Sequence, residues 1–176
     1  TQHLAERRTE GVRMNVNFLG EAVLSEAESE RRLQQYLQGL QWPETEVVSI
    51  KISTLYSQIS PLAREHTVSV LCDRLERLFR TADRAQFVRP DGTAVPKFVY
   101  LDMEEYRDKE LTAAAFMRTL DRDGLQPVRA GIALQSYIPD SFRTLLQLQE
   151  WARRRVANGG GRITIRLVKG ANMESE

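Results

Sequence analysis

The order of apolar and polar positions divides the chain into short runs with a period of two and longer runs with a helical period. The short runs predict strands at 13–19, 46–53, 97–102, 130–136 and 162–168. Helical spacing follows at 25 to about 40, 60 to about 78, 108–120 and 139 to about 156. Strands that alternate with helices in this way predict parallel pairing through right-handed crossovers.

Local signals support these boundaries. Ser25 followed by Glu28 fits a capping box. Ser60 before Pro61 suits the cap and first position of the next helix. Pro90-Asp91-Gly92 predicts a turn, and the glycines of 158–161 predict the end of the last helix.

Polar side chains recur at alternate positions toward the C-terminal end of each predicted strand. They are Asn15, Asn17 and Glu21; Ser49, Lys51 and Ser53; Asp102 and Glu104; Gln135 and Tyr137; and Thr164 and Arg166. The opposite parity is apolar, as in Val48, Ile50 and Ile52. Strands of a doubly wound sheet are buried on both faces and read as nearly continuous apolar runs. The alternation therefore favours a (β/α)8 barrel of the TIM type, with the polar positions facing a common interior.

Four polar side chains, Lys51, Asp102, Gln135 and Arg166, lie at the same end of successive predicted strands. Barrels of this type keep their chemistry at that end. Buried without partners, these groups would be costly, so they must pair, hydrate or hold a ligand. The purely structural alternative is a network that pairs Lys51 with Asp102 and Arg166 with Glu21. Four such residues on successive strands favour a site.

Composition changes this picture little. The chain has 176 residues and a formal net charge of +1, so one substantial core suffices and no nucleic-acid-binding surface is indicated. The basic run 153–155 is interpreted as the solvated end of a helix, and Cys72, the single cysteine, as a buried thiol. We find no apolar run long enough for a transmembrane segment and no signal-peptide pattern, so we expect a cytoplasmic domain.

Several kinds of site lack support. No G-x-G-x-x-G motif follows a strand, which argues against a dinucleotide or P-loop fold. His3 and His66 stand alone, so no metal site is predicted. No G-x-S-x-G nucleophile elbow is present. A lysine at a strand end leaves a Schiff-base lyase or aldolase open, with Lys51 as the nucleophilic amine.

The strand ends resemble those of the proline dehydrogenase family, in that family's order. The matching stretches are FLGEA (18–22), SIKIS (49–53), LDME (101–104), LQSY (134–137) and RLVKGA (166–171). The last stretch is the most specific, and the likeness is greatest to the proline dehydrogenase domain of bifunctional proline utilization A enzymes. The resemblance implies a lead-in helix in 1–12 and the first five strand–helix units of the barrel in 13–176.

The resemblance further implies an FAD-dependent oxidation of L-proline to Δ1-pyrroline-5-carboxylate, the first step of proline catabolism to glutamate. A hydride would pass from the proline ring to flavin N5, and a quinone would then accept the electrons. An NAD-dependent aldehyde dehydrogenase domain would lie elsewhere in a bifunctional parent. The implied location is the cytoplasm, with peripheral association at the inner membrane left open.

Residue roles follow from the same resemblance. Lys51 would bind the substrate carboxylate, with Asp102 beside it to keep it charged and oriented. Arg166 would stabilise negative charge on the reduced flavin, and Glu21 would help to gate the substrate site. The implied catalytic residues are Asp102 and Arg166. The implied cofactor contacts are Met103, Gln135, Arg166, Val168, Lys169, Gly170 and Ala171.

The chain departs from the family pattern at two positions. Asn17 stands where an aspartate is common, and Asn172 stands where an aromatic residue is common. Strands six to eight and the family's carboxylate-binding arginine pair have no counterpart in these residues. We therefore expect a segment of a longer enzyme with weak or no catalysis on its own, and a non-catalytic barrel fragment is the alternative.

Overall fold

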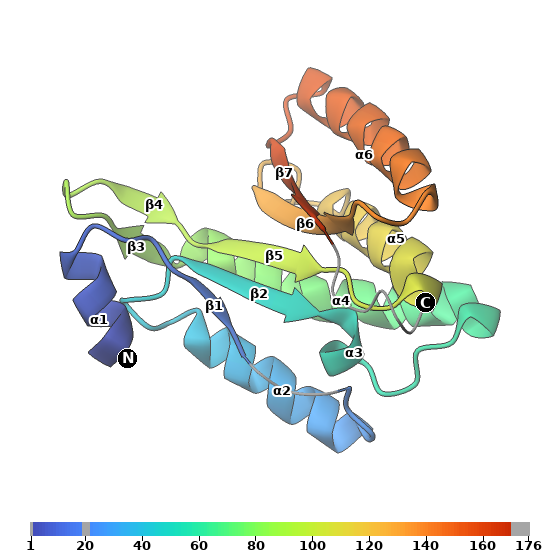
Figure 1. Ribbon diagram of the computed structural model, residues 1–176, viewed down its shortest axis with the longest axis horizontal. Coiled ribbons are helices and arrows are strands. Elements are labelled where there is room, and N and C mark those ends of the chain that lie inside the picture. The colour runs from blue at the N-terminus through green and yellow to red at the C-terminus, as the bar shows by residue number, and fades with distance from the viewer. Residues whose placement is uncertain (1, 19–21, 170–176) are drawn as a thin grey trace.

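A five-stranded parallel sheet forms the framework of the computed structural model, which describes residues 2–18 and 22–169. Its strands are β1 (Asn15–Asn17), β2 (Val47–Lys51), β5 (Phe98–Asp102), β6 (Ala130–Gln135) and β7 (Ile163–Val168). They lie in chain order, and every neighbouring pair is parallel (Figure 1). This is the arrangement of consecutive strands in a (β/α)8 barrel, so the predicted fold class is confirmed.

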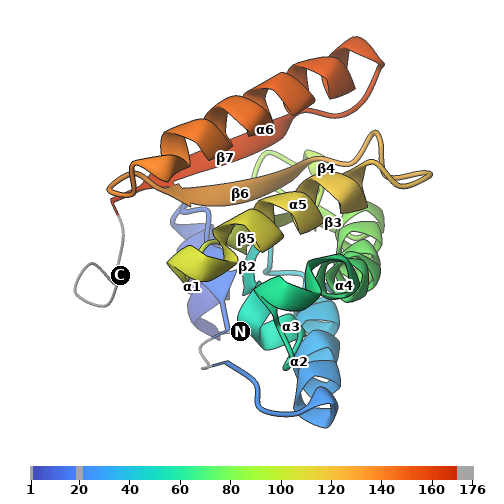
Figure 2. The same ribbon diagram turned by 90° about the vertical axis from the view of Figure 1, so that its right-hand side faces the viewer.

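Apart from the first helix, which precedes the sheet, the long helices connect the strands and lie along one face of the curved sheet, as Figures 1 and 2 show. The α-helices are α1 (Gln2–Thr9), α2 (Glu26–Gly39), α3 (Ile52–Leu55), α4 (Arg64–Arg84), α5 (Lys109–Leu120) and α6 (Asp140–Ala157). Two 3-10 turns, η1 (Pro61–Ala63) and η2 (Tyr106–Asp108), precede α4 and α5. The opposite face of the sheet carries the polar parity identified from the sequence.

Helix α2 begins as the capping-box pattern predicts. The Ser25 hydroxyl accepts a hydrogen bond from the Glu28 backbone N–H at 3.2 Å. The Glu28 carboxylate in turn accepts from the Leu24 backbone N–H at 3.1 Å. The first bond satisfies an N–H group that the helix leaves without a partner, and the second ties the residue before the N-cap to the first turn.

The start of α4 differs from the prediction. Ser60 and Pro61 open the 3-10 turn η1, α4 itself begins at Arg64, and the Ser60 hydroxyl makes no capping bond. The Thr67 hydroxyl fixes this turn, because it donates to the Ser60 carbonyl at 3.2 Å and accepts from the Ser60 N–H at 3.3 Å. The backbone N–H and carbonyl of Ser60, and not its hydroxyl, therefore make the hydrogen bonds at the start of this helix.

Strand β2 is shorter than predicted, because the chain turns into α3 directly after Lys51. The Thr54 hydroxyl donates to the Lys51 carbonyl at 2.8 Å, and the Tyr56 N–H donates to the Ile52 carbonyl at 3.1 Å. These local bonds replace sheet pairing at the end of the strand. Ser53 therefore lies in a helical turn, and its predicted place on the strand was wrong.

A β-hairpin was not predicted. Strands β3 (Gln86–Val88) and β4 (Ala94–Pro96) pair antiparallel outside the main sheet. The predicted turn connects them, with Gly92 at a φ of 82°. The Asp91 carboxylate accepts from the Thr93 N–H at 2.9 Å. Two strands of three residues are too short to show a clear period.

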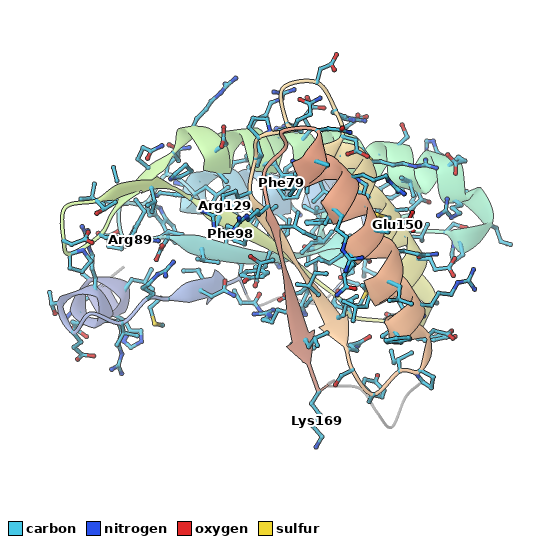
Figure 3. All side chains as sticks on the ribbon, turned by 90° about the horizontal axis from the view of Figure 1, so that it is seen from above. Phe79, Arg89, Phe98, Arg129, Glu150 and Lys169 are labelled. Atoms are coloured by element: carbon cyan, nitrogen blue, oxygen red, sulfur yellow. The ribbon has the colours of Figure 1, made fainter. Side chains whose placement is uncertain are left out.

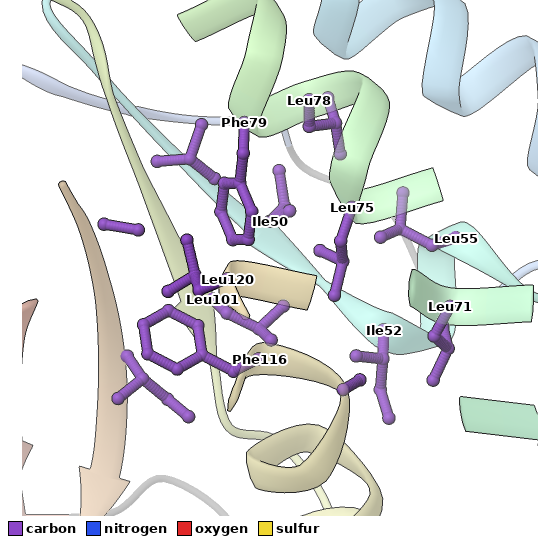
Figure 4. Packing of buried hydrophobic residues seen from close by; sticks show 14 of the residues in the cluster. Ile50, Ile52, Leu55, Leu71, Leu75, Leu78, Phe79, Leu101, Phe116 and Leu120 are labelled. Atoms are coloured by element: carbon purple, nitrogen blue, oxygen red, sulfur yellow. The ribbon is translucent and has the colours of Figure 1, made fainter. Parts of the chain in front are cut away.

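The hydrophobic core lies between the sheet and its covering helices (Figure 4). Ile50 and Leu101 from the sheet meet Phe79 of α4 and Phe116 of α5, all essentially without exposed surface. The two phenylalanine rings meet edge to face with centroids 6.1 Å apart, a favoured aromatic geometry. Cys72 is buried, as predicted.

The basic run at the end of α6 is not uniformly solvated. Arg153 and Arg154 are exposed, whereas Arg155 is only 6% exposed. Its guanidinium donates to backbone carbonyls of Leu125 and Val128, between α5 and β6, and of Gly161, between α6 and β7. The prediction of a solvated run was therefore wrong for Arg155, because an arginine can turn back into the molecule when carbonyl groups are available there.

Candidate functional site

Lys51 ends β2 and forms an ion pair with Glu104, the second residue after β5. Its Nζ lies 2.6 Å from Glu104 Oε1. In the sheet, Lys51 is the register partner of Asp102, yet the direct ion pair goes to Glu104. Asp102 therefore lies beside Lys51, but the Lys51–Asp102 ion pair of the purely structural alternative is replaced by the pair with Glu104, which lies in the loop directly beyond the strand end.

Glu104 connects residues from three different elements. Its Oε2 accepts a short hydrogen bond from the Ser53 hydroxyl of α3. Its backbone carbonyl accepts from Gln135 Nε2 at the end of β6, at 2.8 Å. Ser53, Lys51 and Gln135 are thus held around one residue. In the sequence, Glu104 shares the strand parity of Asp102. That parity was the signal for its place in the site, and no role was predicted for it.

Asp102 forms its ion pair with Arg166 of β7. Burial raises the pKa of the Asp102 carboxyl above its ordinary value, and the positive charge of Arg166 and a hydrogen bond from Ser49 oppose part of that rise. Ser49 also accepts from the Asn15 amide at 2.9 Å. A chain of polar contacts therefore crosses the sheet interior from β1 to β7. The predicted Arg166–Glu21 pair concerns a residue outside the described segments.

Tyr100 forms a platform under Arg166. The Arg166 guanidinium carbon lies 5.0 Å from the centre of the Tyr100 ring, within range of a cation–π contact. The ring lies against Gly131 of β6, where an added Cβ would overlap it. Gly131 is therefore needed for close approach, and the platform depends on a residue without a side chain.

Two polar atoms beside these pairs have no hydrogen-bond partner among the described residues. They are Gln135 Oε1, an acceptor, and Arg166 Nε, a donor, and both are buried. Gln135 Nε2 donates to the Glu104 carbonyl, so the Gln135 side-chain oxygen is the atom available as an acceptor. A buried acceptor and a buried donor on neighbouring strands suit a ligand that offers both, as a flavin ring does.

The structure brings together some of the predicted site residues and not others. Lys51, Asp102, Gln135 and Arg166 share one end of the sheet. Met103 follows Asp102 but is buried within the hydrophobic core. Lys169 extends from the end of β7 away from the described body (Figure 3), and the Val168 carbonyl accepts from the Ser136 N–H at 2.7 Å. Glu21, Gly170 and Ala171, like Asn172, lie outside the described residues.

A charged cavity of about 350 Å³ lies at the opposite, N-terminal end of the strands. It is lined by Arg13, Arg89 and Glu46, and by Phe98 and Arg129, which Figure 3 marks. The nearly buried Glu46 carboxylate accepts from Arg13 at 2.6 and 2.7 Å and from Arg89 at 3.3 Å. We interpret these two ion pairs as structural.

The described ranges contain neither a metal-binding cluster nor a membrane-spanning helix. In residues 2–18 and 22–169, no cluster of histidine, cysteine and acidic side chains is arranged to hold a metal ion. Within the same ranges, no helix combines the length and apolar character that crossing a membrane requires.

The sequence profile of the proline dehydrogenase family matches residues 1–176. Solved structures of proline utilization A (PutA) are similar over almost the whole chain. PutA from Corynebacterium freiburgense is 41% identical, with a TM-score of 0.87 over 97% of this chain. PutA from Bdellovibrio bacteriovorus, inactivated by N-propargylglycine, is 29% identical, with a TM-score of 0.84 over 99% of this chain.

The matched region is a small part of each relative. The chain spans 17% of the first PutA chain and 19% of the second. PutA from Bradyrhizobium japonicum is 21% identical over 98% of this chain and 18% of its own, with a TM-score of 0.78, and supports the fold alone. No curated protein sequence matches the chain. The proline dehydrogenase domains of these PutA proteins are barrel-type folds.

Proposed function

Because the chain belongs to the proline dehydrogenase family, we propose that it supplies the first five strand–helix units of a barrel that oxidises L-proline to Δ1-pyrroline-5-carboxylate. The observation that carries this proposal is the gathering of Lys51, Asp102, Gln135 and Arg166 at the C-terminal end of parallel strands. Barrel enzymes place their reacting groups at this end. The remaining units would come from chain outside these residues.

Lys51 is the proposed binding group for the substrate carboxylate. Its ammonium has three N–H donors, and one of them serves Glu104. The other donors suit a carboxylate oxygen, and a charge-assisted hydrogen bond of this kind is among the stronger contacts a protein offers. Binding the carboxylate here would orient the proline ring.

The chemistry that FAD supplies when bound is acceptance of a hydride at N5. The residues proposed to hold it are Gln135 and Arg166, through their unpartnered polar atoms, with Met103, Val168 and Lys169 and the undescribed Gly170 and Ala171. Arg166 would place positive charge beside the ring, where negative charge grows on reduction. Asp102 fixes the position of Arg166 through their ion pair.

The Schiff-base alternative is less well supported. A lyase of that type requires a free, neutral amine as nucleophile. The Lys51 ammonium is instead engaged by the Glu104 carboxylate at 2.6 Å. A carboxylate-binding role uses the ammonium as it stands.

The wider context is also part of the proposal. We propose a cytoplasmic enzyme that passes electrons to a quinone, with peripheral contact at the inner membrane where quinones reside. By analogy with the PutA relatives, a separate NAD-dependent aldehyde dehydrogenase domain of the same protein would oxidise the product toward glutamate. Neither the quinone nor the second domain involves residues described above.

Replacing Lys51 tests the proposed substrate contact. In the full-length enzyme, Lys51→Met should raise KM for proline by about 10- to 100-fold, the value of one charged hydrogen bond. The FAD content, read from the visible absorption spectrum, should stay unchanged. Lys51→Arg, which keeps the positive charge, should be affected less. An unchanged KM in Lys51→Met would remove the lysine from substrate binding.

A further inference from the structure

Two small residues, Gly131 and Ala133, occupy positions of β6 that share the inward parity of Gln135, and both are buried. In the sheet register, Gly131 is the partner of Tyr100 in β5, and Ala133 is the partner of Arg166 in β7. Neither small residue projects a long side chain from β6. Side chains from β5 and β7 can therefore meet in front of the strand that separates them.

Arg166 is the side chain that uses this space. Its guanidinium pairs with the Asp102 carboxylate, and its guanidinium carbon lies 5.0 Å from the centre of the Tyr100 ring. The Arg166 side chain is still 38% exposed, so burial alone does not fix its position. A long side chain loses rotamer entropy when it is held in one geometry. The carboxylate and the ring are the two contacts that offset this cost.

The Tyr100 ring is itself held in place by its neighbours. The Phe98 ring lies beside it, with centroids 5.0 Å apart. On the side of β6, a Cβ added at Gly131 would lie 2.2 Å from the nearest ring carbon. The ring thus fills the place that a side chain on β6 would take. It offers its face to the guanidinium, as a cation–π contact requires.

We propose that Tyr100 is a positioning residue, which holds the Arg166 guanidinium beside the bound flavin and so favours the reduced form of the cofactor. The inference rests on the proposed flavin-binding role of Arg166. A positive charge beside the flavin stabilises the negative charge of the reduced ring, and this effect falls with distance. A guanidinium released from its place would lose part of the effect. Tyr100 acts through Arg166 and requires no contact of its own with the cofactor.

The redox equilibrium of bound FAD in the full-length enzyme tests this role. The ratio of reduced to oxidised FAD would be read from absorption spectra against a reference dye of known potential. Tyr100→Leu removes the ring and should lower this ratio about fivefold at a fixed dye potential, the equivalent of one cation–π contact. Tyr100→Phe keeps the ring and should restore the wild-type ratio. A Tyr100→Phe ratio as low as that of Tyr100→Leu would contradict a role for the ring.

Two further variants show whether Tyr100 acts through the arginine. In an Arg166→Met background, Tyr100→Leu should leave the ratio unchanged, because no guanidinium remains to be positioned. Gly131→Ala displaces the ring without removing it, and it should lower the ratio in the same direction as Tyr100→Leu. It answers the question independently if Tyr100→Leu fails to retain FAD.

The results separate this inference from the function on which it rests. If Tyr100→Leu and Gly131→Ala leave the ratio as it was, or if Tyr100→Leu lowers it equally with and without Arg166, the positioning role is overturned while the flavin site stands. If Arg166→Met alone leaves the ratio unchanged, the proposed role of Arg166 fails, and this inference fails with it. If the full-length wild-type protein binds no FAD, the proposed function itself is overturned.

Discussion

Arg155, near the end of α6, directs its guanidinium into the protein and joins the segment before β6 to the segment before β7. It donates to the carbonyls of Leu120, Leu125 and Val128, and to Gly161 just before β7. The guanidinium also lies over the Trp151 ring at 5.4 Å. Desolvation lowers the pKa of the Arg155 guanidinium, but arginine remains charged at any ordinary pH. Its contribution is therefore that of a donor to four backbone carbonyls at once.

Removing this donor should be costly. Arg155→Met keeps much of the side-chain volume but removes the donor that four backbone carbonyls share, so we expect the free energy of unfolding of the full-length protein's barrel to fall by about 3 kcal/mol. Chemical denaturation would measure it. The neighbouring Arg154→Met is the control, because Arg154 forms an ion pair with the exposed Glu150, a contact of little value. Equal effects of the two substitutions would contradict the role assigned to Arg155.

Among the elements, β6 is distinguished by burial along its whole length. Its inward positions are filled partly by neighbours, since the Tyr100 ring of β5 occupies the space beside Gly131. That ring also touches Phe98, with centroids 5.0 Å apart, and supports Arg166. The small residue on one strand and the large residue on the next interdigitate, as the interior of a barrel requires.

A double-mutant cycle tests this interdigitation. Gly131→Ala alone should lower the unfolding free energy of the full-length protein by about 1 to 3 kcal/mol, because the new methyl group overlaps the Tyr100 ring. In a Tyr100→Ala background the same substitution should cost less, with the Phe98 ring, 2.9 Å from the added Cβ, as the contact that remains. Thermal or chemical unfolding of the four proteins gives the coupling energy. Additive effects would show that the ring and the glycine do not interact.

At the scale of the whole molecule, ion pairs at the N-terminal end join segments that are distant in the chain. Glu46, just before β2, accepts from Arg13 ahead of β1 and from Arg89 in the β3–β4 hairpin. Burial pushes the pKa of the Glu46 carboxyl upward, but the two arginines outweigh it, and the net result is a lowered pKa. The ionised form is therefore favoured by folding.

The sign of the pH effect follows from that shift. Because the folded state lowers the pKa of Glu46, its contribution is complete above the ordinary glutamate pKa of about 4.3 and is lost as pH falls through the lower, folded-state value. Glu46→Gln should destabilise the full-length protein by about 1 to 3 kcal/mol at pH 7, and the gap to wild type should close in acid. Urea unfolding between pH 7 and 3 would show this. Glu150→Gln, at an exposed pair, should change little at any pH; a gap for Glu46→Gln that does not vary with pH would contradict the pKa argument.

The sequence by itself determined the alternation of strands and helices, the parity of polar positions and the strand ends at which Lys51, Asp102, Gln135 and Arg166 appear. These are local properties: hydrophobic period and strand polarity are set by neighbouring residues, and parallel pairing then places like ends together. The five strands of the main sheet were found for this reason. The short β3–β4 hairpin and the turn α3 were missed, because too few residues carry their pattern.

Only the tertiary structure decided which charges pair. Parity places Asp102 beside Lys51, but the ion pair goes to Glu104, while Asp102 turns to Arg166 across β6. It likewise decided that Arg155 is buried although its neighbours are exposed. The physical reason is that the ion pairs of long side chains depend on the distance between charged groups on neighbouring elements and on how deeply each charged group is buried. Neither quantity is contained in the spacing of residues along the chain.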